Sequence, residues 1–409
     1  MKKLVQVFLG ILTAIGGFVD IGDLVANALV GARFGMNLAW VVLVGVVGIC
    51  LFADMSGRVA AVTGRGTFDL VRERLGPRVG LLNLSASTLV TFLTLAAEIG
   101  GVALALELAT SVSYLLFVPL VAFLVWMVIW RMPFEKMEKA FGLAGLALLV
   151  FAVALWQLGP DWSALLSSAA NPHVPGTEDA PTYWYYAIAL FGAAMTPYEV
   201  FFFSSGGVEE GWTKKDLGIE RVNVYIGFPL GAILSLAIAA CSAIVFLPQG
   251  IGVDHLDQVA LPIVLSLGKV GLAFVIVGFV AATFGAALET ALSTGYSLAQ
   301  YLGWQWGKHV KPREASRFHA VVLVATVLGA MVVLTTLDPI KVTEYSIVFS
   351  AVALPLTYFP ILVVANDPSY MGDEVNGRVV NGLATVYLGI IGAAAVAAIP
   401  LMLWTKAGQ

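Results

Sequence analysis

The feature that most constrains this chain is a series of apolar runs, each long enough to cross a lipid bilayer, that recurs along the whole sequence. A membrane-spanning helix needs about 20 mainly apolar residues, and within lipid the backbone must satisfy its own hydrogen bonds, which favours helices. The composition agrees: 59% of the residues are hydrophobic, 12% are charged and the mean hydropathy is +0.91. The sequence therefore predicts an all-α integral membrane protein without a sizeable soluble domain.

We predict one transmembrane domain over residues 1–409, with about eleven spans. The first run follows Lys2 and Lys3 as a signal peptide would, but Asp20, Asp23 and the continued helical pattern indicate that it is retained. The spans are predicted at residues 3–33 with an interruption, 37–63, 80–110, 113–131, 134–158, 182–206 with an interruption, 220–247, 262–302, 313–336, 340–365 and 377–404.

The distribution of positive charge predicts the orientation of the chain in a plasma (inner) membrane. Cytoplasmic loops of membrane proteins are enriched in Lys and Arg. With the N-terminus in the cytoplasm, all but four of the 22 Lys and Arg residues fall on the cytoplasmic side. The exceptions are Arg33, Lys269, Lys341 and Lys406. An odd number of spans and an external C-terminus follow.

The spans divide into two groups of five, at about residues 1–158 and 182–365, with an additional helix at 377–404. Because five is odd, the two groups start on opposite sides of the membrane, which is the outline of an inverted repeat. Each group interrupts its first helix, at "GGFVDIGDLV" and at Pro197 in "FGAAMTPYEVFFFSS". Broken helices in matching positions of two repeats indicate a substrate site near the membrane midplane.

Three carboxylates lie beside these predicted breaks: Asp20 and Asp23 in the first span and Glu199 in the sixth. An ionised carboxylate at the bilayer centre costs about 2.5–3.5 kcal/mol, and neighbouring carboxylates repel each other unless a cation lies between them. We therefore predict a cation site, with Thr196 on the wall formed by the sixth span. The alternatives are that Asp23 or Thr196 caps a half-helix and that Glu199 pairs with a basic residue elsewhere.

Other polar residues also fall inside predicted spans. Glu98 and Glu289 are mid-span, and they either serve the permeation path or support the site, or they are structural carboxyls that are protonated or paired. Asp54 is predicted to pair with Arg58 one helical turn later. Tyr198 is interpreted as a packing aromatic or as a group that supports the site.

Several functions are not expected. The sequence contains no P-loop, no HExxH, no paired-cysteine metal site and no nucleophile elbow, so we do not expect an enzyme, and nothing indicates a nucleic-acid partner. Cys50 and Cys241 lie in apolar runs and are predicted to be core residues. None of the four histidines is predicted near the midplane, where a proton relay would need one.

The sequence resembles the natural-resistance-associated macrophage protein (Nramp) family of divalent-metal transporters over nearly its whole length. The stretch "VDIGDLVANALVGARFGMNLAWVVL" is similar to the family's Asp-Pro-Gly-Asn helix and the turn and helix that follow it. "GAAMTPYEVFFFSS" resembles its Met-Pro-His-Asn region, and "AEIGGVALALEL" its third helix. The resemblance implies a repeat of the amino acid-polyamine-cation transporter type. It implies that the metal is a substrate rather than a cofactor, and it is compatible with a monomer in the bilayer.

The resemblance also assigns residues. Asp20 matches the family's metal-binding aspartate, Glu98 matches the third-helix glutamate, and Gly17 and Ala193 would offer backbone carbonyls to the metal. Other family positions carry a different residue here: Pro becomes Ile21, Asn becomes Asp23, Met becomes Thr196, His becomes Tyr198, Asn becomes Glu199 and a proton-transfer Asp becomes Leu95.

These departures change the chemistry of the expected site. A thioether favours soft transition metals, whereas carboxylate, hydroxyl and carbonyl oxygens suit Mg²⁺ and Mn²⁺. Mg²⁺ is typically held by a few carboxylates with several waters retained. The pattern resembles the Nramp-related magnesium transporters, which implies Mg²⁺ uptake, with Mn²⁺ as a second ion, and no obligatory proton coupling.

Two alternatives stay open from the sequence. One is a proton-coupled Mn²⁺ or Fe²⁺ transporter in which Glu98 carries the proton. The other is a cation-coupled symporter for an amino acid or another organic solute, which the acidic site disfavours because a half-helix N-terminus would then have to face an anionic group.

Overall fold

The computed structural model describes residues 8, 10–12, 14–15, 18–308, 310–335 and 338–408, and in these parts of the chain it contains helices, turns and loops but no strand. Within the described residues, ten helical segments are long and apolar enough to cross a membrane. The predicted first span lies partly outside the described residues and is not one of the ten. The all-α membrane architecture predicted from the sequence is confirmed.

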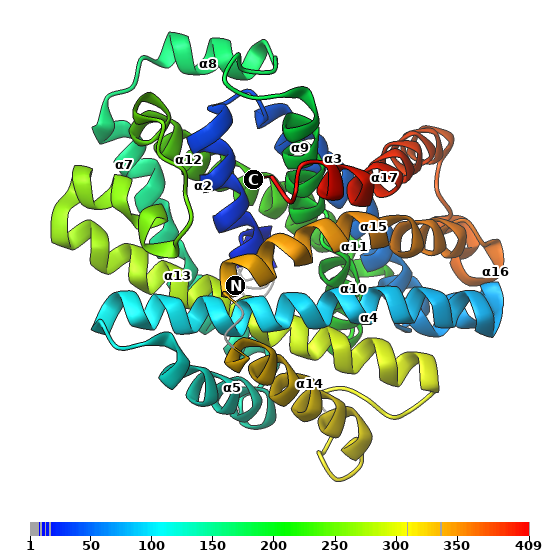
Figure 1. Cartoon of the computed structure of the whole chain (residues 1–409). Coiled ribbons are helices and arrows are strands. Elements are labelled where there is room, and N and C mark those ends of the chain that lie inside the picture. The colour runs from blue at the N-terminus through cyan, green and yellow to red at the C-terminus, as the bar shows by residue number, and fades with distance from the viewer. Residues whose placement is uncertain are drawn as a thin grey trace.

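The helices pack around a common core, with α2 next to α12 and α9 (Figure 1). Two of the spans are composite: α6 continues through a 3₁₀ turn into α7, and α11 continues through a π-helical turn into α12. The bounds are α2 (Ile21–Phe34), α3 (Ala39–Thr63), α4 (Thr67–Thr110), α5 (Tyr114–Arg131), α6 (Phe134–Gly145), α7 (Val150–Leu158), α8 (Trp162–Ala170), α9 (Ala180–Ala194), α10 (Pro197–Glu209), α11 (Leu217–Val222), α12 (Phe228–Val245), α13 (Leu256–Leu302), α14 (Ser316–Leu334), α15 (Pro339–Ala365), α16 (Pro368–Met371) and α17 (Arg378–Trp404).

Two helices are longer than predicted. α4 starts at Thr67 and not near residue 80, and α13 starts at Leu256 and not near residue 262. Each contains a glycine with positive φ, Gly76 at +83° and Gly268 at +60°, so each is two helical pieces joined at a kink. Glycine permits this left-handed backbone at little cost. The hydropathy pattern identified the apolar piece and missed the extension before it.

Both predicted helix breaks are present. Val19 and Asp20 are not helical, and α2 begins at Ile21. In the sixth span, α9 ends at Ala194, Thr196 is extended, and α10 begins at Pro197. Proline favours the first position of a helix and disfavours a helical conformation in the residue before it. The sequence therefore fixes the second break through Pro197.

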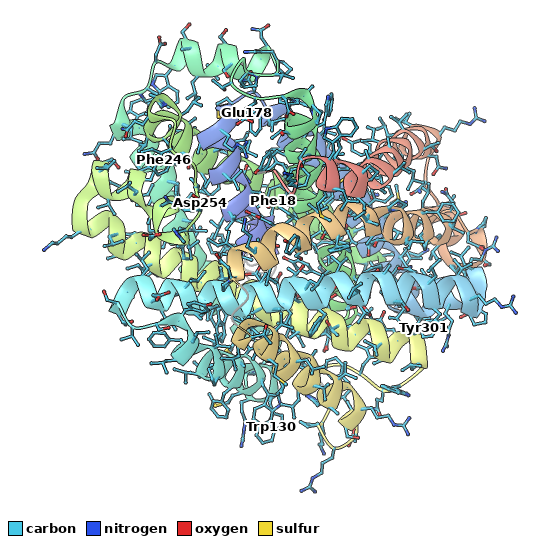
Figure 2. All side chains as sticks on the ribbon, viewed as in Figure 1. Phe18, Trp130, Glu178, Phe246, Asp254 and Tyr301 are labelled. Atoms are coloured by element: carbon cyan, nitrogen blue, oxygen red, sulfur yellow. The ribbon has the colours of Figure 1, made fainter. Side chains whose placement is uncertain are left out.

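Glycines let the broken spans approach their neighbours closely. A β-carbon at Gly31 of α2 would lie 2.1 Å from the Ala239 carbonyl oxygen of α12, and one at Gly192 of α9 would lie 2.3 Å from the Ile347 carbonyl oxygen of α15. Phe18, labelled in Figure 2, packs on Gly231 of α12. The first span is thus held against α12 on both sides of its break, and the first half of the sixth span against α15.

Candidate functional site

Asp20 lies at the break of the first span and is 1% exposed. Its Oδ1 accepts a hydrogen bond of 2.9 Å from the backbone N–H of Asp23, so Asp20 is the N-cap of α2. A capping carboxylate satisfies an N–H that has no partner within the helix and also favours the positive end of the helix dipole. The alternative that Asp23 caps this half-helix is therefore wrong, because the cap is three residues earlier.

Tyr198 connects the two broken spans. Its hydroxyl donates to Asp20 Oδ2 at 3.1 Å, across 178 positions of sequence. Tyr198 is fully buried in the first turn of α10, and its carbonyl accepts from the Ser293 hydroxyl of α13 at 3.2 Å. The interpretation of Tyr198 as a packing aromatic is incomplete, since its hydroxyl holds the carboxylate at the first break.

Asp23 is fully buried in the first turn of α2. Its Oδ1 accepts from the Asn27 side-chain amide at 2.8 Å. Its Oδ2 makes no hydrogen bond of normal geometry to the residues described, although the Ser235 hydroxyl of α12 lies nearby. A buried carboxylate oxygen without a donor is costly, and a bound cation would relieve that cost.

Glu98 reaches the same break from α4. It is fully buried, and its Oε1 accepts from the Ile21 backbone N–H at 3.0 Å, while its Oε2 has no hydrogen-bond partner in the described part of the chain. Two amides at the start of α2 thus donate to carboxylates, one to the N-cap residue Asp20 and one to Glu98 of α4. The mid-span position of Glu98 made it a candidate, but its contact with Ile21 could not be read from the sequence.

The wall formed by the sixth span carries Thr196 and Glu199, which are 6% and 2% exposed. Thr196 occupies the N-cap position of α10, but its side chain makes no capping hydrogen bond, so the capping alternative fails for its hydroxyl. Glu199 forms no ion pair within the described residues, which contradicts the alternative of a basic partner. Its Oε2 also lacks a hydrogen-bond partner there.

The carbonyl of Ala193 lacks its usual helical backbone donor for a covalent reason. Ala193 lies next to the last residue of α9, and the residue four positions later is Pro197, which has no N–H to donate. The neighbouring Met195 carbonyl is occupied, because it accepts from the Tyr358 hydroxyl at 3.2 Å. Gly17, the other predicted carbonyl donor, lies outside the described residues.

The acidic groups are close to one another without forming a closed cage. Asp20, Glu98, Glu199 and Glu289 all lie within electrostatic range of the Tyr198 hydroxyl. In the described part of the chain, however, no three His, Cys, Asp or Glu side chains are arranged to hold a metal ion. The acidic side chains of the two broken spans therefore lie near Tyr198 without forming a metal cage in this conformation.

Arg33 anchors the C-terminal end of α2, which is the end away from Asp20. Its guanidinium donates to both carboxylate oxygens of Glu178, at 2.8 and 2.9 Å, and also to the Tyr186 hydroxyl and the Gly408 carbonyl. Figure 2 places Glu178 at that end of α2. Such a bidentate pair is strong and geometrically specific, and together these bonds join the C-terminal end of α2 to the residues before α9 and to the end of the described chain.

Other predictions can also be compared with the structure. Asp54 pairs with Arg58 at 3.7 Å as predicted, and also with Arg221 of α11 at 3.5 Å. Cys50 and Cys241 are free and buried, which confirms their assignment to the core.

Comparisons with known proteins identify the family. Residues 10–400 match the family model described as natural resistance-associated macrophage protein-like. The chain belongs to this family. Its members are membrane transporters and not enzymes, and in them the metal is cargo rather than a cofactor.

Two bacterial relatives named divalent metal cation transporter MntH, from Erwinia tasmaniensis and Klebsiella pneumoniae, are each 25% identical over 92% of this chain and 89% of their own length. A mutant of the Eremococcus coleocola manganese transporter is similar in structure, with a TM-score of 0.74 and 16% identity over 99% of this chain and 94% of that one. MhsT in complex with L-phenylalanine is also similar in structure, with a TM-score of 0.65 and 17% identity over 97% of both chains. These structural likenesses confirm the predicted inverted-repeat fold of this Nramp-family chain.

Proposed function

We propose that this Nramp-family chain takes up divalent cations across the plasma membrane by alternating access, with its N-terminus in the cytoplasm and its C-terminus outside. The observation that carries the proposal is the bond from Tyr198 to Asp20, which joins two broken helices where buried carboxylates have no cationic partner among the described residues. The names of the MntH relatives support it. The proposed ligands are Asp20, Asp23, Thr196, Glu199 and the carbonyls of Gly17 and Ala193.

Such uptake needs no second ion as a driving force. A potential of −100 mV favours entry of a divalent cation by about 4.6 kcal/mol, which is twice the value of about 2.3 kcal/mol for one elementary charge. We therefore propose transport without obligatory proton coupling.

We propose Mg²⁺ as the preferred ion, with Mn²⁺ as a second substrate. The side-chain donors proposed for the site are all oxygens, which suit hard cations. The nearby thioether, that of Met195, packs against Gly48 of α3 and so turns away from α2. One protein of similar structure is named a manganese transporter, which makes the choice between these two ions the first property to measure.

The test is uptake of Mg²⁺ and of Mn²⁺ into proteoliposomes, with the internal pH recorded, for the native protein and for Asp23→Asn. We expect Mg²⁺ uptake without internal acidification, and we expect Asp23→Asn to lower Mg²⁺ uptake more than Mn²⁺ uptake. The substitution removes one hard, charged ligand and keeps the size of the side chain.

Two outcomes would favour other functions. Mn²⁺ uptake that resists excess Mg²⁺ and acidifies the lumen would indicate the proton-coupled transporter, with Glu98 as the carrier. Uptake of an amino acid by a variant with uncharged residues at positions 20 and 23 would indicate the organic-solute symporter.

A further inference from the structure

A small cavity of about 40 Å³ adjoins the candidate site. It lies between the segment that leads into Asp20, the helix α6, and the facing sides of α10 and α13. Val19, Phe141 and Phe202 contribute to a lining that is almost wholly apolar. Among the described residues of this lining, Glu289 of α13 is the ionisable one.

Glu289 is on the face of α13 that looks toward the sixth span. Ser293, one helical turn later and so on the same face, donates to the Tyr198 carbonyl at 3.2 Å. Val19 immediately precedes Asp20, and Phe202 lies in the half-helix that begins beside Thr196. The cavity therefore touches both broken spans, and Glu289 lines it from the face of α13 that contacts Tyr198.

The charge of Glu289 is unusual for such a wall. A carboxylate inside a membrane protein is costly and commonly marks an ion path. Glu289 lies within electrostatic range of Glu98 as well as of Tyr198, so it adds negative charge to a region that already holds Asp20 and Glu199. A passing divalent cation would convert that repulsion into attraction.

We infer that Glu289 is a second, transient ligand for the cation, which receives it from the Asp20–Glu199 site on the way out through this cavity. The inference rests on the proposed function and adds the release step to it. At about 40 Å³ the cavity has room for a few waters at most. It must therefore widen before an ion can pass, by separation of Leu12, Ile15 and Val19 from the lining residues of α6 and α13.

The experiment compares the native protein with Glu289→Gln in two assays. One is cation binding to the purified protein by calorimetry, with Mg²⁺ and with Mn²⁺. The other is the initial rate of uptake of the same ions into proteoliposomes. We expect Glu289→Gln to bind the cation within about twofold of the native affinity and to transport it about tenfold more slowly, because a release ligand affects the rate and not the resting site.

Glu220→Gln is the matched control. Glu220 of α11 is a carboxylate that, unlike the half-buried Glu289, is fully buried. Both Glu220 oxygens lack a hydrogen-bond partner within the described chain, and Glu220 does not line the cavity. We expect it to keep the native rate. If Glu289→Gln does not fold, Glu289→Asp, which keeps the charge but shortens its reach, should show native affinity and a rate below the native one.

The outcomes separate this inference from the proposed function. If the native protein transports divalent cations and Glu289→Gln does so at the native rate, the release ligand is wrong and the proposed function stands. The same holds if affinity and rate fall together, because Glu289 would then belong to the resting site. If the native protein moves no divalent cation, both are wrong.

Discussion

Asp20 uses its two carboxylate oxygens for different purposes. Oδ1 caps α2 by accepting from the Asp23 amide, and Oδ2 accepts from the Tyr198 hydroxyl of the opposite broken span. The capping contact needs only an acceptor oxygen, whereas a cation needs the negative charge. The structural and the proposed functional roles of this residue can therefore be separated by substitution.

We predict that Asp20→Asn keeps most of the stability and loses the cation. The asparagine oxygen can still cap α2, but the charge is gone. Asp20→Ala should lose both, with a further cost of about 0.5–2 kcal/mol in the free energy of unfolding for the missing cap. Thermal unfolding in detergent and cation uptake measure the two effects. Equal melting temperatures for the two variants would contradict the capping role.

A second residue-scale prediction concerns Lys308, in the loop after α13. Burial lowers the pKa of its ammonium group to about 8, although the Glu209 carboxylate opposes this change. Its Nζ donates to the Met137 sulfur at 2.8 Å, and its backbone N–H donates to Glu209. Between pH 8 and 10.5 the unfolded chain holds more protons at this lysine than the folded protein does, so its contribution to stability rises with pH.

The measurement is the free energy of unfolding from pH 7 to pH 10.5 for the native protein, for Lys308→Met and for the control Lys311→Met. The contribution of Lys308 is fully present above pH 10.5 and lost as the pH falls through about 8. The free energy of unfolding of Lys308→Met should therefore rise less steeply with pH than that of the native protein. Lys311→Met, which replaces an exposed lysine of the same loop, should keep the native slope. Identical slopes in all three proteins would contradict the lowered pKa of the Lys308 ammonium group.

At the scale of elements, local sequence predicted the breaks. Gly and Asp in the first span and Pro197 in the sixth are recognisable helix breakers, and both breaks are where they indicated. Spans set by apolar length were predicted nearly as well. The start of α4 was missed because the piece before Gly76 is polar, so that hydropathy gives no signal there.

What the sequence could not supply are contacts between helices. The donation from Ile21 to Glu98 and that from Tyr198 to Asp20 join residues 77 and 178 positions apart. Each depends on how one helix lies on another, and helical periodicity carries no information about that. The same limit explains why Asp23, and not Asp20, was named as the alternative cap, since both aspartates suit the position chemically.

The close packing of α2 on α12 gives a prediction about an element. Gly31→Ala would place its methyl group against the Ala239 carbonyl oxygen and separate the helices. Overpacking of this kind typically costs about 1–3 kcal/mol. Gly389→Ala, in α17 where no atom lies within 4 Å of the new β-carbon, is the control. It should be neutral, or stabilising by up to about 1 kcal/mol through helix propensity.

Thermal unfolding of both glycine variants, with cation uptake measured in parallel, checks this prediction. Gly31→Ala should unfold at a lower temperature than Gly389→Ala. A Gly31→Ala protein as stable as the native one would mean that α2 can shift away from α12 without loss.

For the whole molecule, the buried carboxylates make the cation a ligand of the folded state. Asp20, Asp23, Glu98 and Glu199 are each at most 2% exposed, and no ion pair to any of them occurs in the described residues. A ligand that binds only the folded protein stabilises it by about 2.7 kcal/mol at 100 times its Kd. We predict that chelation by EDTA lowers the melting temperature of the native protein and that Mg²⁺ restores it.

Asp20→Asn is the comparison for this effect. Because the substitution removes the charge that the cation needs, its melting temperature should respond little to EDTA or to Mg²⁺. A native protein indifferent to both reagents would show that the acidic region binds no divalent ion in the folded state.

The packing of the two broken spans determines how the spacing of the proposed ligands changes when the helices move. The first span is held on α12 through Gly31 and Gly231, and the first half of the sixth is held on α15 through Gly192. The ligands proposed for one ion are therefore divided between two tightly packed bodies, and the hydrogen bond from Tyr198 to Asp20 crosses the seam between them. An ion that these ligands can bind together at only one spacing favours the conformation that has this spacing between the two bodies. The size of the ion therefore selects the conformation.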